Sequence, residues 1–403
     1  MLVNDATDAA LDELLAESVS DAMSRERHAF DLAAAAHRAR GVVLVGMGGL
    51  GRRVLGALRA ANVEPLALAD NGAHRHGTVL DGHEILSVPE AVRRHGEATF
   101  VVTIWGAGSP HRFEHTRAQL ASLGARSVSA FPPLLWKHPD GALPHYCQDL
   151  PHHVLEQAAE VRRALALWSD EASRQEYLAQ VRFRLLADFD GLAHPVAAPQ
   201  YFCDELYRYS DSECFVDCGA FDGDTIRVLL DRAEVNRVIA LEPDPVNVAA
   251  LERYAATAHC PGGIAVLPLA ASAARGQAFI ETTGTASSAL TSSAHGGAVA
   301  IDCAPLDELL EREMPTFIKM DIEGAEPDAL AGARQTIVRT RPVLAICVYH
   351  RQDHLWSIPL SLAEMCDRYR FFLRPHNEEG WDLVCYAVPE ERLRAGAGDR
   401  DER

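Results

Sequence analysis

Apolar positions at helical spacing dominate the first 40 residues of the chain. They recur every three or four residues, the period of one face of an α-helix, with polar or small residues between them. We therefore expect one or two leading helices over residues 1–40, whose apolar stripe packs against the rest of the protein. The apolar positions are Leu11, Leu14, Leu15, Val19, Met23, Phe30 and Leu32.

Between residues 41 and 150 the pattern changes to short apolar runs that alternate with helical segments. The stretch GVVLVGMGGLG predicts a strand, a glycine turn and the start of a helix, and a second strand follows that ends at Asp70. Further strands are expected at 99–104 and around 127–131. Because strands that alternate with helices are typical of parallel sheets, we predict a Rossmann-like domain that ends in proline-rich FPPLLWKHPDGALP.

A second α/β series follows a charged, helical segment at 152–190, which we interpret as a helical connector over 151–200. This second domain is assigned to 201–392. Its last two strands are separated only by PHNEEGW, which is too short for a parallel crossover, so they should form an antiparallel hairpin at one edge. The seven expected strands are 214–218, 237–242, 264–269, 316–321, 343–348, 370–374 and 382–388.

The predicted fold class is therefore α/β, with two Rossmann-like domains joined by a helical connector. Residues 284–297, GTASSALTSSAHGG, are expected to form a flexible loop, and 393–403 a disordered tail.

Charge and cysteine content narrow the function classes. The 38 Lys+Arg and 57 Asp+Glu give a formal net charge of −19, which disfavours nucleic acid and anionic membranes as partners. The nine cysteines form no C-x-x-C pair, which favours core thiols in a reducing, cytoplasmic compartment and no zinc site. Neither a signal peptide nor a membrane span is predicted. A homo-oligomer is left open.

The clearest candidate for a cofactor site begins at the first strand of the second domain. Asp217-x-Gly219-x-x-x-Gly223 follows this strand, and a helix starts near Thr225. Glycines let the backbone turn sharply and approach a ligand, and Asp217 could accept a hydrogen bond from a cationic amine. Asp222 and Asp224 make the turn acidic, which would repel a pyrophosphate and favours S-adenosylmethionine over a dinucleotide.

A second carboxylate supports this cofactor. Twenty-five residues after Asp217 the next strand ends in Leu241-Glu242-Pro243, where Glu242 could accept both ribose hydroxyls. The alternative is that Asp217 and Glu242 only cap loops of a generic Rossmann sheet. Asp222 and Asp224 could equally be a solvated face or a helix cap.

Four motifs in order resemble those of FkbM-type methyltransferases: FVDCGAFDGDT, VIALEPDPVNVAAL, FIKMDIEGAEPDALAGA and RPVLAICVYHRQDHLWSIP. The resemblance spans roughly 200–390. It implies a seven-stranded class I methyltransferase fold, S-adenosylmethionine as methyl donor, and usually O-methylation of hydroxyls on sugars or natural products.

Acceptor chemistry is expected in the loops after the fourth and fifth strands, IKMDIEGAE and CVYHRQDH, because ligands of open α/β sheets bind beyond the carboxyl ends of the strands. We predict His350 as a general base and Asp321 as the residue that orients it or contacts the acceptor. The other candidates there are Lys319, Glu323, Glu326, Asp353 and His354.

Structural roles compete for several of these side chains. Lys319 and Glu323 could form an ion pair, Glu326 could begin the next helix, and His354 could only pack. Asp321, Glu323 and His350 could also collect Mg or Mn, but no compact ligand spacing supports this, so no metal is predicted.

The first domain carries a glycine motif of its own. Gly46-x-Gly48-x-x-Gly51 opens a helix, and Asp70 lies 24 residues after Gly46, which fits the dinucleotide fingerprint. The region resembles small Rossmann-like domains that precede sugar-modifying catalytic domains, where a nucleotide or nucleotide sugar is bound. A scaffold that has kept only the fold is the alternative. A second glycine turn, WGAGSPH at 105–111, favours a small-molecule site.

The resulting hypothesis is a methyltransferase that uses S-adenosylmethionine and acts on a hydroxyl of a saccharide or secondary metabolite, with a small-molecule or glycan acceptor as partner. A nicotinamide-dependent oxidoreductase that works from the first domain is the alternative, although no Tyr-x-x-x-Lys pair is present there. A noncatalytic protein that binds S-adenosylmethionine is another.

Overall fold

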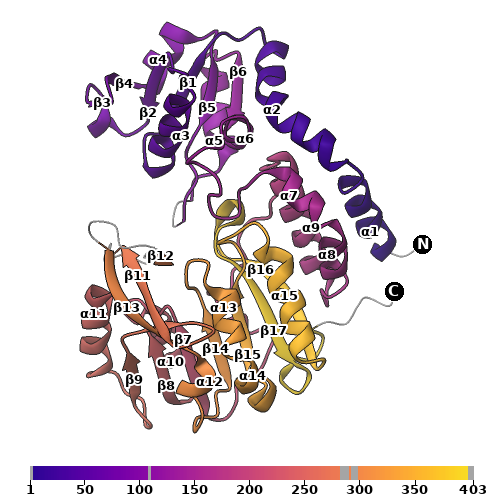
Figure 1. Cartoon of the computed structure of the whole chain (residues 1–403), viewed down its shortest axis with the longest axis vertical. Helices are drawn as coiled ribbons and strands as arrows, with labels where there is room; N and C mark the ends of the chain where they lie inside the picture. Colours follow the sequence, from indigo (N-terminus) through magenta and orange to yellow (C-terminus); the bar gives the residue numbers. More distant parts are fainter. Residues whose placement is uncertain (1–2, 108–109, 282–289, 292–297, 398–403) are drawn as a thin grey trace.

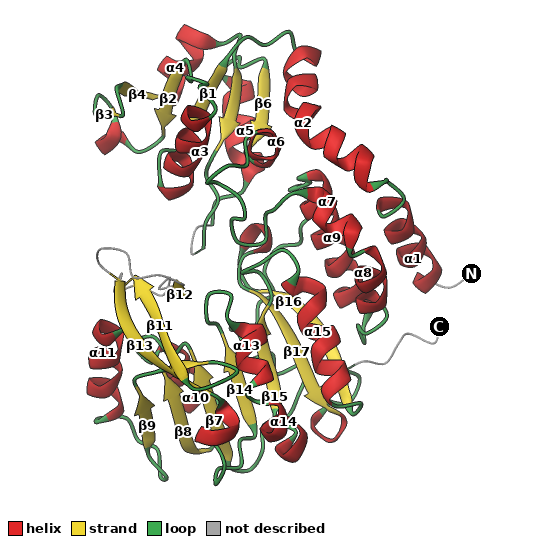
Figure 2. Cartoon of the chain, viewed as in Figure 1, coloured by secondary structure: helices red, strands yellow, loops and turns green. Residues whose placement is uncertain are grey.

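Two bodies of strands and helices make up the protein in the computed structural model, which describes residues 3–107, 110–281, 290–291 and 298–397. The two bodies lie at opposite ends of the long axis (Figure 1). Beside the region where they meet lie helices α7 (Pro151–Glu156), α8 (Ala158–Leu165) and α9 (Glu171–Leu186). Each body has a main sheet with helices beside it (Figure 2). The predicted fold class, α/β with two Rossmann-like domains, is confirmed.

A six-stranded sheet in the order β3-β4-β2-β1-β5-β6 forms the core of the N-terminal body. Strand β1 is buried along its whole length and pairs in parallel with β2 and β5, as a continuous apolar run predicts. The hairpin of β3 and β4 was not expected, because only two of the five residues of β4 are buried. The bounds are β1 Val42–Val45, β2 Ala67–Asp70, β3 Val79–Leu80, β4 His83–Ser87, β5 Thr99–Val102, β6 Ser127–Ala130, α3 Gly49–Ala60, α4 Val88–His95, α5 Phe113–Ser122 and α6 Pro132–Lys137.

The leading helices pack on the connector as well as on the first body. Helix α1 contacts α8 and α9, and α2 contacts α6 and α7. Leu11, Leu15 and Phe30 are buried as expected, whereas Met23 and Leu32 are exposed and the prediction for them is wrong. The bounds are α1 Val3–Leu14, α2 Val19–Ala36, α7 Pro151–Glu156, α8 Ala158–Leu165 and α9 Glu171–Leu186.

The C-terminal body is built on a seven-stranded sheet in the order β16-β17-β15-β14-β7-β8-β9. Strands β16 and β17 form the expected antiparallel hairpin at one edge, and β17 also pairs antiparallel with β15. The remaining neighbours, from β15 to β9, are parallel. The strands are β7 Glu213–Cys218, β8 Val235–Leu241, β9 Ile264–Leu267, β14 Phe317–Met320, β15 Val343–Cys347, β16 Tyr369–Pro375 and β17 Leu383–Pro389. The helices are α10 Asp224–Leu230, α11 Pro245–Ala255, α12 Leu306–Leu309, α13 Glu326–Ala331, α14 Arg334–Thr340 and α15 His354–Met365.

A third, four-stranded sheet in the order β10-β13-β11-β12 was not predicted. Ile280, Ile301 and Cys303 form a small separate core within it, and the alternation of buried Ile301 and Cys303 with Asp302 is a strand signal that the sequence offered. Apart from the two residues of β12, the expected loop at 284–297 lies outside the described residues. The bounds are β10 Ala270–Ala271, β11 Gly276–Glu281, β12 Leu290–Thr291 and β13 Ala298–Ala304.

The end of the described chain is attached to the second body. Leu393 pairs with Tyr207, and the backbone N–H of Arg394 donates to the carbonyl of Leu206. The expected disordered tail therefore does not begin at 393, and residues 398–403 lie outside the described part.

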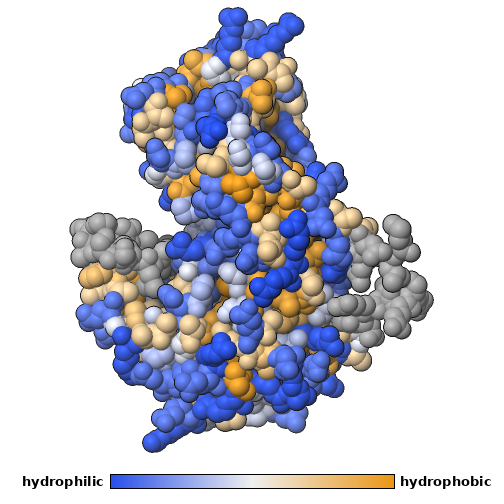
Figure 3. Space-filling view, turned by 45° about the vertical axis from the view of Figure 1, so that its right-hand side comes forward, coloured by the Kyte–Doolittle hydropathy of each residue, from blue (hydrophilic) through white to orange (hydrophobic). Residues whose placement is uncertain are grey.

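The face in Figure 3 is mostly hydrophilic, with apolar residues spread among the polar ones. Within the described residues, no helix is both long enough and apolar enough to cross a bilayer.

Candidate active site

A cavity of about 690 Å³ lies between the carboxyl ends of the strands of the two bodies. Its walls come from turns that follow β1 and β5 in the first body and β7, β8, β14 and β15 in the second. The first body contributes Gly49, Leu50, Arg53, Trp105, Gly106 and Ala107. Among the residues from the rest of the chain are His145, Tyr146, Gly219, Phe221, Asp224, Thr225, Leu241, Glu242, Pro243, Asn247, Lys319, Asp321, Glu323, Tyr349, Trp381 and Asp382.

The two glycines of the turn after β7 are required by close contacts within the protein. Gly219 has φ +85°, and a Cβ there would lie 2.0 Å from the carbonyl oxygen of Asp321. Gly223 has φ +87° and caps α10, and a Cβ there would lie 2.6 Å from the ring of Tyr254. The turn is therefore packed directly against the loop that follows β14. Gly219 also lines the cavity, whereas Gly223 does not.

Asp217 is fully buried and does not line the cavity. It lies opposite Lys319 in the register of β7 and β14, and the Lys319 Nζ is 3.1 Å from its carboxylate and donates to the carbonyl of Gly219 at 2.7 Å. Burial raises the pKa of Asp217 to about 6, and the neighbouring ammonium of Lys319 opposes this rise. The expected direct contact of Asp217 with a cofactor amine is not supported, since its partner is already a buried lysine.

Glu242 lies where the sequence placed it, at the end of β8, and it lines the cavity. One carboxylate oxygen accepts from the backbone N–H of Phe221 and the other from that of Asp244, both at 2.9 Å. Burial raises the pKa of Glu242 above its ordinary value, although these backbone donors oppose the rise. The carboxylate is thus oriented by the neighbouring turn and directed at the cavity.

The remaining predicted cofactor residues divide into two groups. Thr225 and Pro243 line the cavity, as does Asp224, whose side chain accepts from the backbone N–H of Thr225. Asp222 lies outside the cavity wall and pairs with Arg227 at 2.9 Å. The structural reading, a solvated charge, therefore describes Asp222.

Asp321 lines the cavity and is held by three side chains. Its carboxylate accepts from the hydroxyl of Tyr201 at 2.6 Å and from that of Tyr349 at 3.4 Å, and it lies 3.2 Å from the Nε2 of His350. Burial alone would raise the pKa of Asp321, but His350 and Lys319 bring it well below its usual range. Asp321 is therefore an anion with a fixed orientation.

His350 is buried behind Asp321 and is not part of the cavity wall. Its Nδ1 lies 2.8 Å from Glu326 on the side opposite to Asp321. Burial would lower the pKa of His350, but the carboxylates of Glu326 and Asp321 raise it well above its ordinary value. The two carboxylates favour the protonated form of His350, and the ring does not reach the cavity wall, so this arrangement does not favour His350 as the general base, a role that stays a prediction.

Glu323 is the second carboxylate on this wall of the cavity. Burial raises the pKa of Glu323 to about 7, and its backbone adopts φ +55°, a left-handed conformation that is unusual for a residue with a side chain. The alternative ion pair between Lys319 and Glu323 is not formed, because Lys319 pairs with Asp217. Glu323 lies 3.9 Å from the Nε2 of His350 instead.

The other candidates in these loops have structural positions. Glu326 begins α13, as the structural reading expected, and it also accepts from the backbone N–H of Ile322 at 3.0 Å. His354 begins α15, is buried, and lies 3.4 Å from Glu326. Asp353 occupies the N-cap position of the same helix without a side-chain capping hydrogen bond. Glu326 therefore connects both histidines to the loop that carries Asp321 and Glu323.

The group of Asp321, Glu326 and His350 is compact enough to be considered as a metal site, since one ligand atom from each lies within 4.8 Å of the others. The two carboxylates, however, lie at opposite nitrogens of the same imidazole. A metal ion would need one point at about 2.0–2.2 Å from every ligand atom. The arrangement fits an imidazolium between two carboxylates better than a metal.

Aromatic side chains that the sequence analysis did not single out form another part of the wall. Trp105 packs on Trp381 with ring centroids 4.6 Å apart, and Tyr146 packs on Trp381 at 4.5 Å. Tyr146 also stacks on Tyr349 at 6.4 Å. These residues come from distant parts of the chain, so only the position of Trp105 directly after a strand offered a signal.

Two polar contacts fasten the first body to the second beside this aromatic wall. The indole Nε1 of Trp105 donates to the carbonyl of Glu379 at 3.0 Å, and buried Arg112 pairs with Glu378 at 2.6 Å. The cavity wall from the first body is therefore held in place by both packing and charge.

The glycine motif of the first body has the predicted local geometry. A Cβ at Gly51 would lie 2.0 Å from the carbonyl oxygen of Gly46, so this close helix-to-strand contact requires glycine. Asp70 accepts from the backbone N–H of Met47 at 2.7 Å. Gly46, Gly48, Gly51 and Asp70 do not line the cavity, which begins with the adjacent Gly49 and Leu50. Of the turn at 105–111, residues 108–109 lie outside the described residues.

Comparison with known proteins agrees with this geometry. Residues 217–379 match the model of the methyltransferase FkbM domain. A crystal structure of methyltransferase FkbM from Methylobacillus flagellatus KT is similar over 96% of this chain and 99% of its own, with 24% sequence identity and a TM-score of 0.74, and so shares the fold of both bodies.

Two further comparisons add no support. UDP-D-quinovosamine 4-dehydrogenase from Vibrio fischeri overlaps 23% of this chain and 79% of its own at 21% identity, but its TM-score of 0.21 carries no argument. A search of curated proteins finds no match. Residues 217–379 of this chain are thus similar to the methyltransferase FkbM domain, and the whole chain shares the fold of the crystal structure of methyltransferase FkbM.

Proposed function

We propose that this methyltransferase transfers the methyl group of S-adenosylmethionine to a hydroxyl of a saccharide or secondary metabolite. The observation that carries the proposal is one cavity of about 690 Å³ in which Glu242 lines one part and Asp321 and Glu323 line another. Pockets of this size suit small organic ligands.

The residues around Glu242 fit the donor. Glu242 presents a buried carboxylate that is already oriented by two backbone N–H groups, so it can accept from ribose hydroxyls without rearrangement. The second body places the carboxylates of Asp224 and Glu242 in the wall, and its lysine there, Lys319, is paired with Asp217, which suits a cation better than a pyrophosphate. When bound, S-adenosylmethionine supplies a methyl group that its sulfonium already activates.

Asp321 and Glu323 have different tasks towards the acceptor. Asp321 is held as an anion by His350, Tyr201 and Lys319, so it can orient the acceptor hydroxyl but is a weak base. Glu323 has a pKa of about 7, which is near the optimum for a group that removes a proton at neutral pH. We assign proton removal to Glu323 and alignment of the hydroxyl to Asp321.

His350 and Glu326 act through Asp321 and are positioning residues. The Nε2 of His350 lies 3.2 Å from Asp321, and its Nδ1 is hydrogen-bonded to Glu326, which also accepts from the backbone N–H of Ile322. This chain of contacts fixes the carboxylate that faces the acceptor. Alignment of a reacting oxygen is a large part of the catalysis of a direct displacement.

The first body shapes the acceptor end of the cavity. Trp105 belongs to the aromatic wall, which suits the apolar face of a sugar ring or of a natural product. Arg53 lines the cavity too, and it donates to the carbonyl of Ala142 at 3.1 Å.

Calorimetric titration of the full chain with S-adenosylhomocysteine and with NAD tests the donor assignment. Wild type should bind S-adenosylhomocysteine, and Glu242→Ala should weaken this binding by about 100-fold, since a hydrogen bond to a charged group is worth about 1.5–3 kcal/mol. Asp70→Ala, which removes the corresponding carboxylate of the first body, is the matched control and should not change it. Tight binding of NAD with no binding of S-adenosylhomocysteine would overturn the proposal and favour an oxidoreductase.

A further inference from the structure

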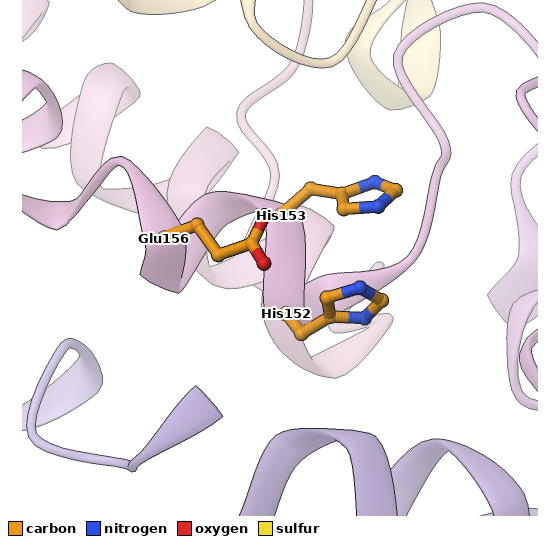
Figure 4. Close-up of side chains that lie close together, drawn as sticks. All are labelled: His152, His153 and Glu156. Atoms are coloured by element: carbon orange, nitrogen blue, oxygen red, sulfur yellow. The ribbon is translucent and has the colours of Figure 1, made fainter. Parts of the chain in front are cut away.

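Helix α7 carries a group of possible metal ligands that the methyltransferase site does not use. His152, His153 and Glu156 each offer one ligand atom, and the three atoms lie within 4.8 Å of one another. Figure 4 shows the two imidazole rings side by side at the start of the helix and the carboxylate of Glu156 on the following turn. None of the three residues lines the cavity between the two bodies.

Each imidazole is oriented by a carboxylate outside this group. The Nδ1 of His152 lies 2.9 Å from Glu26, a buried residue of α2, and the Nδ1 of His153 lies 3.0 Å from Asp149. A carboxylate at Nδ1 favours the tautomer with the proton on Nδ1, in which the lone pair of Nε2 can bind a metal. Histidines that bind metals are oriented in this way in most metalloproteins.

From this geometry we infer that α7 binds a divalent zinc ion through the Nε2 atoms of His152 and His153 and a carboxylate oxygen of Glu156. Two imidazoles and one carboxylate suit zinc and not magnesium, which prefers oxygen ligands and water. Water would complete a tetrahedral set at the solvent side, where His153 is 39% exposed. Ligand atoms of such a set lie about 3.3 Å apart, and the partly exposed His153 and exposed Glu156 can close the remaining gap by rotation.

The position of the site suggests a structural task. Glu26 belongs to α2, which packs on α7, so a metal at His152 would strengthen the contact between the leading helices and the connector. The segment just before α7 carries His145 and Tyr146, which line the cavity. Zinc at α7 would therefore stabilise the junction from which this part of the cavity wall extends.

The direct test is a titration of the full chain, produced without a histidine tag and freed of metal by a chelator, with zinc chloride in a calorimeter. We expect one zinc per chain and a higher midpoint of thermal unfolding when zinc is present. His153→Ala, which changes a partly exposed residue, should remove a ligand and both effects. Magnesium chloride should produce neither effect.

Two variants separate a built site from unspecific binding. Asp149→Asn should weaken zinc binding by about 10–100-fold, as expected for loss of the carboxylate that orients a ligand histidine. His259→Ala, a change of an exposed histidine in the second body, should leave it unchanged. The inference is overturned if His153→Ala binds zinc as tightly as wild type, or if His259→Ala weakens binding as much as Asp149→Asn. It does not depend on the proposed methyl transfer.

Discussion

The glycine turns of the two bodies have the same backbone plan and different buried partners. In the first sheet, Leu44 lies two residues before Gly46 and opposite Val101. The equivalent position in the second sheet is Asp217, two residues before Gly219 and opposite Lys319. The carbonyl of Gly46 accepts from the hydroxyl of Thr103 at 2.6 Å, whereas that of Gly219 accepts from the ammonium of Lys319.

The cavity-facing edges of the two sheets also differ in charge. The six cavity-lining residues of the first body include no carboxylate, whereas the second body places Asp224, Glu242, Asp321, Glu323 and Asp382 in the wall. A glycine turn with a carboxylate at the end of the next strand is therefore a property of the fold. What distinguishes the second sheet, whose edge is suited to catalysis, is its charged groups: the buried Asp217–Lys319 pair under the turn and the carboxylates in the cavity wall.

The largest expected effect comes from removing Glu323, the proposed base at the cavity edge of the second sheet. Glu323→Gln should lower turnover with a saccharide acceptor by about 10²- to 10⁴-fold. Because Glu323 acts when deprotonated, wild-type turnover should rise as the pH rises through about 7, and the variant should lose this rise. S-Adenosylhomocysteine affinity should stay unchanged, and a variant that keeps the wild-type pH profile would contradict the assignment.

The second test replaces the buried ion pair of Asp217 and Lys319 by an apolar pair, like Leu44 and Val101 in the first sheet. Lys319→Met leaves Asp217 buried without its partner and should lower the free energy of unfolding by about 3–5 kcal/mol, measured by urea denaturation. The double variant Asp217→Leu with Lys319→Met should recover most of this loss, because an apolar pair replaces the ions. If the double variant does not regain the lost free energy of unfolding, an apolar pair cannot replace the ion pair at this position.

The third test compares the glycines. Gly219→Ala and Gly51→Ala each place a Cβ 2.0 Å from a backbone oxygen and should lower the free energy of unfolding by about 1–3 kcal/mol. Gly48→Ala, where no atom lies within 4 Å, should change it by less than about 0.5 kcal/mol. Gly219→Ala should in addition weaken S-adenosylhomocysteine binding. If Gly51→Ala weakened this binding equally, the two turns would not differ in function.

The smallest expected effect concerns the contribution of the first body to the acceptor. Arg53→Met should raise the KM for an acidic saccharide by at most about fivefold, since partly solvated charges contribute about 0–1 kcal/mol. Arg52→Met, on the same helix but outside the cavity wall, is the control and should leave the KM unchanged. An Arg53→Met variant with altered S-adenosylhomocysteine affinity would place Arg53 at the donor instead.

The sequence predicted best what depends on local patterns. All seven strands of the second sheet and their terminal hairpin follow from apolar runs and loop lengths, and Glu242 follows from its place at a strand end. The hairpin of β3 and β4 and the third sheet were missed, because their strands are short or only partly buried.

The parts that the sequence did not predict depend on long-range contacts. The pKa of His350 is set by Glu326 and Asp321, which are 24 and 29 residues away in the chain. The partner of Asp217 is 102 residues away, and the aromatic wall joins residues 105, 146, 349 and 381. A pattern along the chain cannot place such groups beside each other.

The contact of Trp105 with Trp381 and the Arg112–Glu378 pair have a consequence for how acceptor choice can change. These contacts hold the part of the cavity wall from the first body, which has no carboxylate, against the part from the second body, which has several. Substitutions in the former can alter which molecule fits while the reacting groups stay where they are. Substitutions that broaden acceptor choice should therefore start at Gly49, Leu50, Arg53, Gly106 and Ala107, which line the cavity from the first body, and leave the carboxylates of the second body unchanged.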